Sequence, residues 1–374
     1  KTKVTGDYTF TLATFEPYAI QVAMLENPLC GIISERSYNE SGGDFLKAPV
    51  GTGPYEVVKY TAGDSLVLKG FDDYWIEGQP YVKNVTLRYI TDSSSRVIEA
   101  ESGGADIVYE ITATNVDRVR ANEAINLVSA MGANTSYLYM NQAQKPFEDE
   151  RVRQAVWLAV DIKQAVDVAY GSFGELGTGI ISHRIDGRHP DMSKYFPERD
   201  LEKAKALLAE AGYPNGFETS ISCNSSDQQR KDFCEVVQAQ LSEVGIKVSI
   251  DVMDSTTWSS SLAAGEGFMT IYGLTASTGE AGRVLFRWLP DTSEWPLTSW
   301  ENQEYYDLIN KALATTDHDA RNELYYRCQE MLMENYVVLP VWHKELNAAC
   351  QLDVRGFRIT PSYEQHYLQF VYFE

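Results

Sequence analysis

Positive charge is scarce in this 374-residue sequence, which carries 32 Lys and Arg against 53 Asp and Glu, for a formal net charge of −21. The sequence has no dense run of Lys or Arg, so it lacks the basic footprint of a nucleic-acid-binding surface. It also has no apolar run that approaches the roughly 18–20 residues of a membrane-spanning helix. Because 44% of the residues are hydrophobic and 23% are charged, we expect a folded protein with no nucleic-acid partner.

Motifs that carry catalysis or metal binding are also absent. The five cysteines are scattered without a CxxC pair and are interpreted as buried thiols, and the five histidines form no HExxH motif. There is no GxSxG, SxxK or Walker sequence, and the GTGP at 51–54 is interpreted as a turn. We therefore predict no catalytic residue, no metal site and no cofactor. Paired carboxylates such as Asp72-Asp73 keep a hydrolase open as an alternative.

Helices and strands alternate along the chain, which predicts an α/β protein. The clearest helix is DLEKAKALLAEAG (200–212), where Asp200 is the cap, Leu208 and its neighbours at helical spacing form one apolar face, and Gly212 is the stop. FETSISC (217–223), the helix at 232–245 and IKVSIDVM (246–253) form a βαβ-like unit. Further predicted elements are a strand at 7–13, a helix at 94–102 capped by Ser94, a helix at 254–264, helices near 302–315 and 318–335, and strands at 137–141, 268–274 and 337–343.

Several long blocks resemble the solute-binding proteins of peptide- and nickel-type ABC importers, in the large three-domain subgroup. The blocks are PVGTGPYEVVKY with FDDYW, RVIEAESGGADIVYEI, PFEDERVRQAVWLAVD, DLEKAKALLAEAGYPNGF, LSEVGIKVSIDVM, YYDLINKALATTD and VVLPVWHKE, in this order. The resemblance implies a periplasmic-binding-protein-like fold, a type II two-lobe clamp that closes on its ligand by hinge motion. It implies binding without chemistry and delivery of the ligand to a membrane permease.

The resemblance also implies how the chain is divided. Only 48 residues precede the GTGPY block, where family members carry over a hundred, so we expect an N-terminally truncated chain. Residues 1–48 are then the tail of the small second domain, residues 49–135 with 351–374 belong to domain one, and residues 136–350 form domain three.

Ligand-binding candidates are carried over from the family position by position. Peptide binders hold the ligand amino group with an Asp, whose place Ser277 takes in YGLTASTGEAGR, and Leu274 takes the place of a Trp. Asn224 stands where dipeptide binders have an Arg for the ligand carboxylate. Glu280 and Arg283 are possible substitutes, or else loop charges, and Trp258 is a ligand contact or helix-face packing. The complete candidate set is Asn141, Asn224, Ser255, Trp258, Tyr272, Leu274, Thr275, Ser277, Thr278, Glu280, Arg283 and Trp342.

The resemblance makes a di- or oligopeptide the expected solute, with ABC permease subunits as partners and a monomeric state. Because Ser277 and Asn224 replace the charged residues that bind peptide termini in the family, an oligosaccharide or a metal chelate stays open as an alternative. The same replacements predict that a ligand with a free amino terminus is not preferred. A chemosensory or chaperone-like receptor would share the fold. The family implies an extracytoplasmic location, either periplasmic or lipid-anchored.

Overall fold

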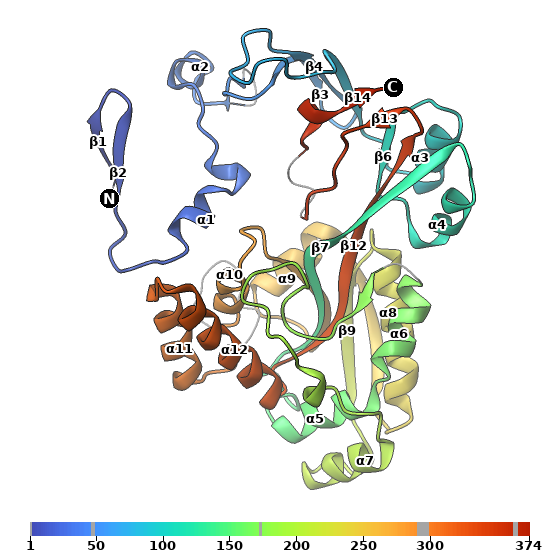
Figure 1. Ribbon diagram of the computed structural model, residues 1–374. Helices are drawn as coiled ribbons and strands as arrows, with labels where there is room; N and C mark the ends of the chain where they lie inside the picture. Colours follow the sequence, from blue (N-terminus) through green and yellow to red (C-terminus); the bar gives the residue numbers. More distant parts are fainter. Residues whose placement is uncertain (1, 46–48, 172–173, 290–298, 362–365) are drawn as a thin grey trace. The chain divides into compact units, whose positions relative to one another are not determined.

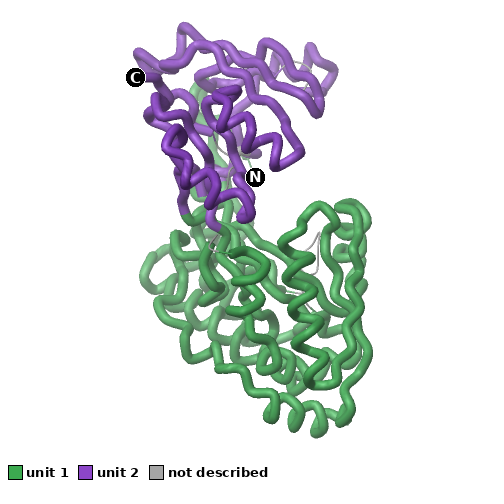
Figure 2. The backbone as a smooth tube through the Cα atoms, turned by 90° about the vertical axis from the view of Figure 1, so that its right-hand side faces the viewer, with its two compact units in different colours: residues 1–24, 131–344 green, residues 25–130, 345–374 purple. Residues whose placement is uncertain are grey.

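The computed structural model describes residues 2–45, 49–171, 174–289, 299–361 and 366–374. The chain forms two compact units (Figure 2), of which unit 1 comprises Lys1–Met24 and Met131–Lys344, and unit 2 comprises Leu25–Ala130 and Glu345–Glu374. The assignment of residues 1–48 to a separate small domain stays a prediction. Among the described residues, no helix is long and apolar enough to cross a membrane.

Unit 1 carries most of the helices (Figure 1). Its elements are β1 (Thr2–Gly6), β2 (Thr9–Leu12), α5 (Glu150–Ala159), α6 (Ile162–Tyr170), β8 (Glu175–Leu176), η3 (Ser193–Tyr195), α7 (Leu201–Glu210), β9 (Glu218–Asn224), α8 (Gln228–Ser242), β10 (Lys247–Met253), α9 (Ser255–Ala263), β11 (Met269–Thr275), α10 (Ala281–Phe286), α11 (Gln303–Ala314) and α12 (His318–Glu334).

Unit 2 is built mainly from short strands. Its elements are η1 (Pro28–Cys30), α2 (Glu35–Glu40), β3 (Tyr55–Thr61), β4 (Ser65–Gly70), β5 (Asn84–Arg88), α3 (Ser93–Glu101), β6 (Ile107–Tyr109), α4 (Ala113–Arg120), β13 (Val354–Arg355), η4 (Leu368–Phe370) and β14 (Tyr372–Phe373). Three elements, α1 (Gln21–Leu25), β7 (Ile125–Met140) and β12 (Val338–Gln351), have residues in both units. A small apolar core of unit 2 includes Ala348, Cys350 and Val371.

The main sheet has the strand order β10-β9-β11-β7-β12-β6. β9 and β10 are parallel and in register from Glu218 opposite Lys247 to Asn224 opposite Met253. β11 is parallel to β9 and antiparallel to β7, with Thr275 opposite Asn134. The carboxyl ends of β9, β10 and β11 therefore meet at one edge of the sheet, where α/β proteins usually place ligands.

Aspartate and asparagine side chains start most helices of unit 1. The carboxylate or amide oxygen accepts a hydrogen bond from a first-turn backbone N–H, which satisfies a donor that the helix itself leaves free. These N-caps are Asp149, Asp161, Asp200, Asp227, Asp254, Asn302 and Asp317. Asp200 confirms the predicted cap of α7, whereas α3 begins at Asp92 instead of the predicted Ser94, because the Asp92 carboxylate accepts from Ser95 N at 2.7 Å.

Several predicted strands differ in extent from the observed ones. The strand predicted at 137–141 is only the end of β7, and the strand predicted at 337–343 is only the first part of β12. Both strands lie between two neighbours in the main sheet, so each has backbone partners from distant parts of the chain.

The core of unit 1 lies between the sheet and its helices. α8 packs on β9 and β10, α6 on α8, α7 on α5, and α11 on α12. The N-terminal segment joins this core, since Ile20 is 2% exposed and Ala19 N donates to Leu313 O at 2.6 Å. Leu208 on α7 is 1% exposed, so the apolar face predicted for this helix is buried.

Replacing Leu208 by Ala tests how much this packing stabilises unit 1. We expect Leu208→Ala to lower the free energy of unfolding by roughly 2–5 kcal/mol, because the substitution leaves a cavity in the core. Val168→Ala on α6 is the control, since Val168 is 60% exposed and should change the value by less than about 0.5 kcal/mol. Urea unfolding followed by circular dichroism gives both values, and a similar small loss in the two variants would contradict the packing of α7.

Candidate functional site

The carboxyl ends of β9 and β10 bring two candidate residues together. Asn224 ends β9, Ser255 begins α9 directly after β10, and Asn224 Nδ2 donates to Ser255 Oγ at 2.9 Å. Asn224 Oδ1 accepts from the backbone N of Ser226 at 3.0 Å, which orients the amide. The edge thus presents small neutral polar groups that can donate and accept hydrogen bonds.

Two aromatic candidates lie beside this edge. Trp258 is 5% exposed, and its Nε1 donates to Thr270 Oγ1 at 3.2 Å, so the indole is fixed in the fold. Its ring centroid lies 5.7 Å from that of Tyr272, with 33° between the planes. Burial raises the pKa of Tyr272, although Arg287 and Arg230 act against this shift.

Arg230 is the residue that the sequence analysis missed. It lies in the first turn of α8, where its backbone N donates to Asp227 Oδ1 at 3.1 Å and its Nε forms an ion pair with Asp227 Oδ2 at 3.1 Å. Its Cζ atom lies 5.7 Å from the centroid of the Trp258 ring. The helix predicted at 232–245 begins after Arg230, whereas the observed α8 begins at Gln228 with Asp227 as its N-cap, so Asp-x-x-Arg was the signal that could have shown the earlier start.

The segment after β11 continues along the same edge. Leu274 is buried, while Thr275 and Ser277 are half-buried, and Thr275 Oγ1 accepts from Asn134 Nδ2 at 2.9 Å. Thr278 Oγ1 is buried and has no hydrogen-bond partner among the described residues. The segment therefore has a fixed beginning and carries hydroxyl groups.

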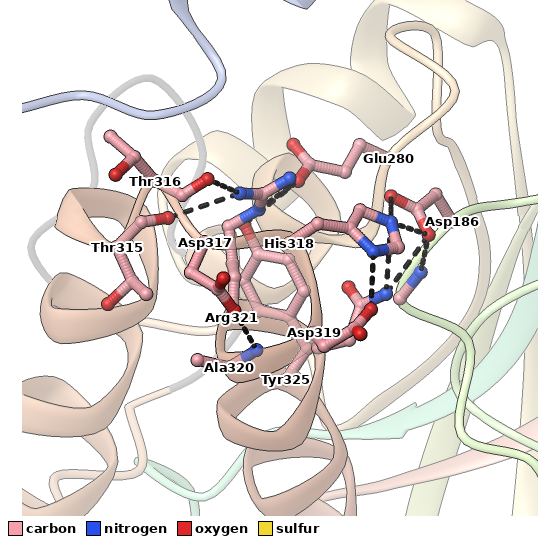
Figure 3. A network of polar contacts seen from close by, with 12 residues as sticks. Asp186, Glu280, Thr315, Thr316, Asp317, His318, Asp319, Ala320, Arg321 and Tyr325 are labelled. Carbon is pink, nitrogen blue, oxygen red and sulfur yellow. Dashed lines mark hydrogen bonds and ion pairs between the residues drawn. The ribbon is translucent and has the colours of Figure 1, made fainter.

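Glu280 fastens the other end of this segment (Figure 3). The Glu280 side chain is 7% exposed and the Arg321 side chain 11%, and Arg321 Nε donates to Glu280 Oε1 at 2.7 Å. Tyr325 donates its hydroxyl to the same oxygen at 3.4 Å. Burial raises the pKa of the Glu280 carboxyl in spite of Arg321. The interpretation of Glu280 as a loop charge is wrong, because the carboxylate is buried and paired; Arg283 is exposed on α10.

Asp186 joins the same network through the backbone. Asp186 N donates to Gly279 O at 3.0 Å, and Ala281 N donates to Asp186 O at 2.8 Å. The Asp186 carboxylate contacts His318 Nε2 at 2.9 Å and accepts from Asn322 Nδ2 at 3.1 Å (Figure 3). Hydrogen bonds to Asp319 and Asp186 raise the pKa of His318. The loop that contains Asp186 and helix α12 therefore hold the end of the 272–280 segment.

The remaining two candidates are not brought to this edge. Asn141 follows the last residue of β7, at the opposite end of β11 from Thr275, and donates to the backbone oxygens of Gly265 and Gly267 at 2.9 Å. Trp342 on β12 is 5% exposed and stacks on Tyr170 with ring centroids 4.1 Å apart. These contacts give both side chains structural roles.

Replacing Glu280 tests whether the buried pair holds the segment. Glu280→Gln leaves the Arg321 guanidinium buried without its counter-charge, so we expect it to lower the free energy of unfolding by roughly 3–5 kcal/mol. Glu334→Gln removes an equal charge from a pair with Arg327 whose side chains are 40% and 39% exposed, and should cost less than about 1 kcal/mol. Equal losses in urea unfolding would show that the Glu280 pair has no special structural role.

The raised pKa of His318 predicts a pH-dependent contribution to stability. A histidine whose pKa is higher in the folded state stabilises the fold below its unfolded pKa of about 6.5, and the contribution is lost as the pH rises through the folded pKa. The melting-temperature difference between wild type and His318→Gln should therefore be larger at pH 6 than at pH 9. Lys163→Gln, which removes an exposed pair with Asp167, should show no such change over this range. A difference for His318→Gln that is the same at both pH values would contradict the assignment.

Comparison with known proteins places this arrangement in a family. The profile of the bacterial extracellular solute-binding proteins, family 5, matches residues 1–295. The glutathione-binding protein GsiB of Shigella flexneri serotype 5b is 29% identical over 371 residues, covering 96% of this chain and 72% of that protein. GsiB of Escherichia coli K12 gives the same identity and coverage.

Solved structures agree with this assignment. The periplasmic binding protein DppA from Helicobacter pylori, in complex with the peptide STSA, superposes with a TM-score of 0.88 at 26% identity over 100% of this chain and 74% of that one. AgaA from A. tumefaciens R10, in complex with agropinic acid, superposes with a TM-score of 0.86 at 26% identity. The match covers 100% of this chain and 77% of that one. The predicted type II periplasmic-binding-protein fold is thereby confirmed. The chain belongs to the bacterial extracellular solute-binding proteins of family 5 and is the substrate-binding component of an ABC importer.

Proposed function

We propose that this protein captures a short peptide or peptide-like solute at the carboxyl ends of β9, β10 and β11. The observation that carries the proposal is the composition of this edge. Asn224, Ser255 and Thr275 offer neutral hydrogen-bonding groups, and Tyr272, which is half-buried and lies beside the buried Trp258 ring, offers an aromatic surface. A peptide needs both kinds of contact, because its amides form hydrogen bonds while its side chains pack against apolar groups or lie in hydrated pockets.

The relatives support the same class of ligand. GsiB is named for binding glutathione, and the H. pylori structure holds the peptide STSA. AgaA, with agropinic acid, shows that a protein of this fold can also take a ligand that is not named as a peptide. We therefore extend the proposal to peptide-like solutes, with Asn224, Ser255, Tyr272, Thr275 and Ser277 as the ligand-contacting set and the buried Trp258 as packing behind Tyr272.

The fixed 272–280 segment favours binding by a prepared surface. Asn134 holds the beginning of the segment, and Arg321 holds its end through Glu280. Little conformational entropy of the segment is therefore lost when the ligand binds. Arg321 and Tyr325 both donate to Glu280 Oε1, whereas Oε2 has no hydrogen-bond partner among the described residues, and we assign the pair with Arg321 the role of positioning the segment. In this proposal the solute is bound and released unchanged, outside the cytoplasmic membrane, and is passed to ABC permease subunits.

Calorimetric titration tests the proposal directly. Glutathione, the tetrapeptide Ser-Thr-Ser-Ala and agropinic acid are titrated into the protein, and we expect at least one of them to bind with a dissociation constant of about 10 μM or tighter, equivalent to about −7 kcal/mol. Ser255→Trp places a large side chain at the carboxyl ends of β9 and β10, where it would overlap the proposed ligand position, and should weaken binding at least tenfold. Val168→Trp introduces the same side chain at a position of α6 that is 60% exposed and should leave binding unchanged.

Two outcomes would contradict the proposal. Binding of a neutral oligosaccharide such as maltotriose, with no binding of the three solutes above, would favour the sugar alternative. Recovery of a cleaved solute in mass spectrometry of the equilibrated mixture, with the Ser255→Trp protein giving none, would favour a hydrolase.

A further inference from the structure

Two of the five cysteines lie together in the core of unit 1. Cys223 is the residue before the end of β9, and Cys234 lies in the second turn of α8, the helix that packs on this strand. Both residues are 0% exposed and belong to the same apolar core. The neighbouring thiol of Cys223, together with burial, raises the pKa of Cys234. The two thiols are therefore in contact, although a turn and the start of a helix separate them in the sequence.

The other three cysteines lie on different elements. Cys328 is buried on α12, where burial raises its pKa to about 12 although Arg327 acts against this shift. Cys350 is buried on β12 in the core of unit 2, and burial raises its pKa to about 12 as well. Cys30 in η1 is exposed, so the interpretation of all five cysteines as buried thiols is wrong at this position. Cys223 and Cys234 differ from the two other buried cysteines because each has a second thiol as its neighbour.

Neighbouring thiols can form a disulfide by exchange with an external disulfide compound. The thiolate of one cysteine attacks the external disulfide, forms a mixed disulfide and releases one external thiolate. The second cysteine then attacks the mixed disulfide, forms the internal S–S bond and releases the other external thiolate. The pair loses two electrons and two protons, and the external compound takes them up as two thiols. Disulfides form and persist outside the cytoplasm, and the family to which this chain belongs is extracellular.

We propose that exchange with an external disulfide joins Cys223 to Cys234 and thereby fastens the start of α8 to the end of β9. The link closes a short loop that contains Asn224 and the helix cap Asp227. A cross-link over such a loop restricts the unfolded chain and stabilises the fold. Burial protects the bond, because a reductant reaches either sulfur only when the core opens. The inference is independent of which solute the protein binds.

Redox equilibration followed by peptide mapping tests the inference. The reduced protein is equilibrated with cystamine and cysteamine, once folded and once in concentrated urea. After acid quenching, the remaining thiols are alkylated in urea and the protein is digested. Trypsin cuts after Lys and Arg, so the disulfide joins the peptides 206–230 and 232–247, which mass spectrometry quantifies. We expect the equilibrium constant for this link to be roughly tenfold or more larger in the folded protein than in urea, because the fold holds the two thiols together.

Cys328→Ala is the matched control, because it removes a buried thiol from α12 and should leave the link unchanged. Cys234→Ala should abolish the linked peptides. The linked wild-type protein should melt at least about 4 °C above its reduced form, and Cys234→Ala should show no such difference between oxidising and reducing buffer.

An equilibrium constant that is no larger in the folded protein than in urea would overturn the inference, because the fold would then not favour the bond. Preferential linkage of Cys223 to another cysteine in the folded protein would also overturn it. So would equal melting temperatures of the linked and reduced wild-type proteins.

Discussion

The in-register parallel pairing of β9 and β10 is the constraint on which the candidate site depends. Parallel strands bring their carboxyl ends to the same edge, and the backbone hydrogen bonds hold that edge whatever side chains follow. Asn224 and Ser255 can therefore form a hydrogen bond across 31 positions of sequence. Because β11 is parallel to β9, Tyr272 and Thr275 arrive at the same edge.

A second constraint fixes the segment that leaves β11. Its two ends are held by different chemistry, a neutral hydrogen bond from Asn134 to Thr275 and a buried ion pair between Arg321 and Glu280. A buried pair gains little net stability, because both charges lose their hydration. The better explanation for its presence is positional, since a guanidinium that is only 11% exposed strongly disfavours any arrangement that separates it from the carboxylate. The pair thus selects one conformation of the segment.

Local patterns predicted the elements better than their connections. The cap and apolar face of α7 and the β9–α8–β10 unit follow from residues close together in the sequence, and both are observed. The full length of β7 and β12 depends on strands that pair with them from distant parts of the chain, which no local window contains. Glu280 was ambiguous for the same reason, because its partner Arg321 lies 41 positions away on α12. Similarly, nothing near Arg230 indicates that Trp258 and Gly273 will surround it.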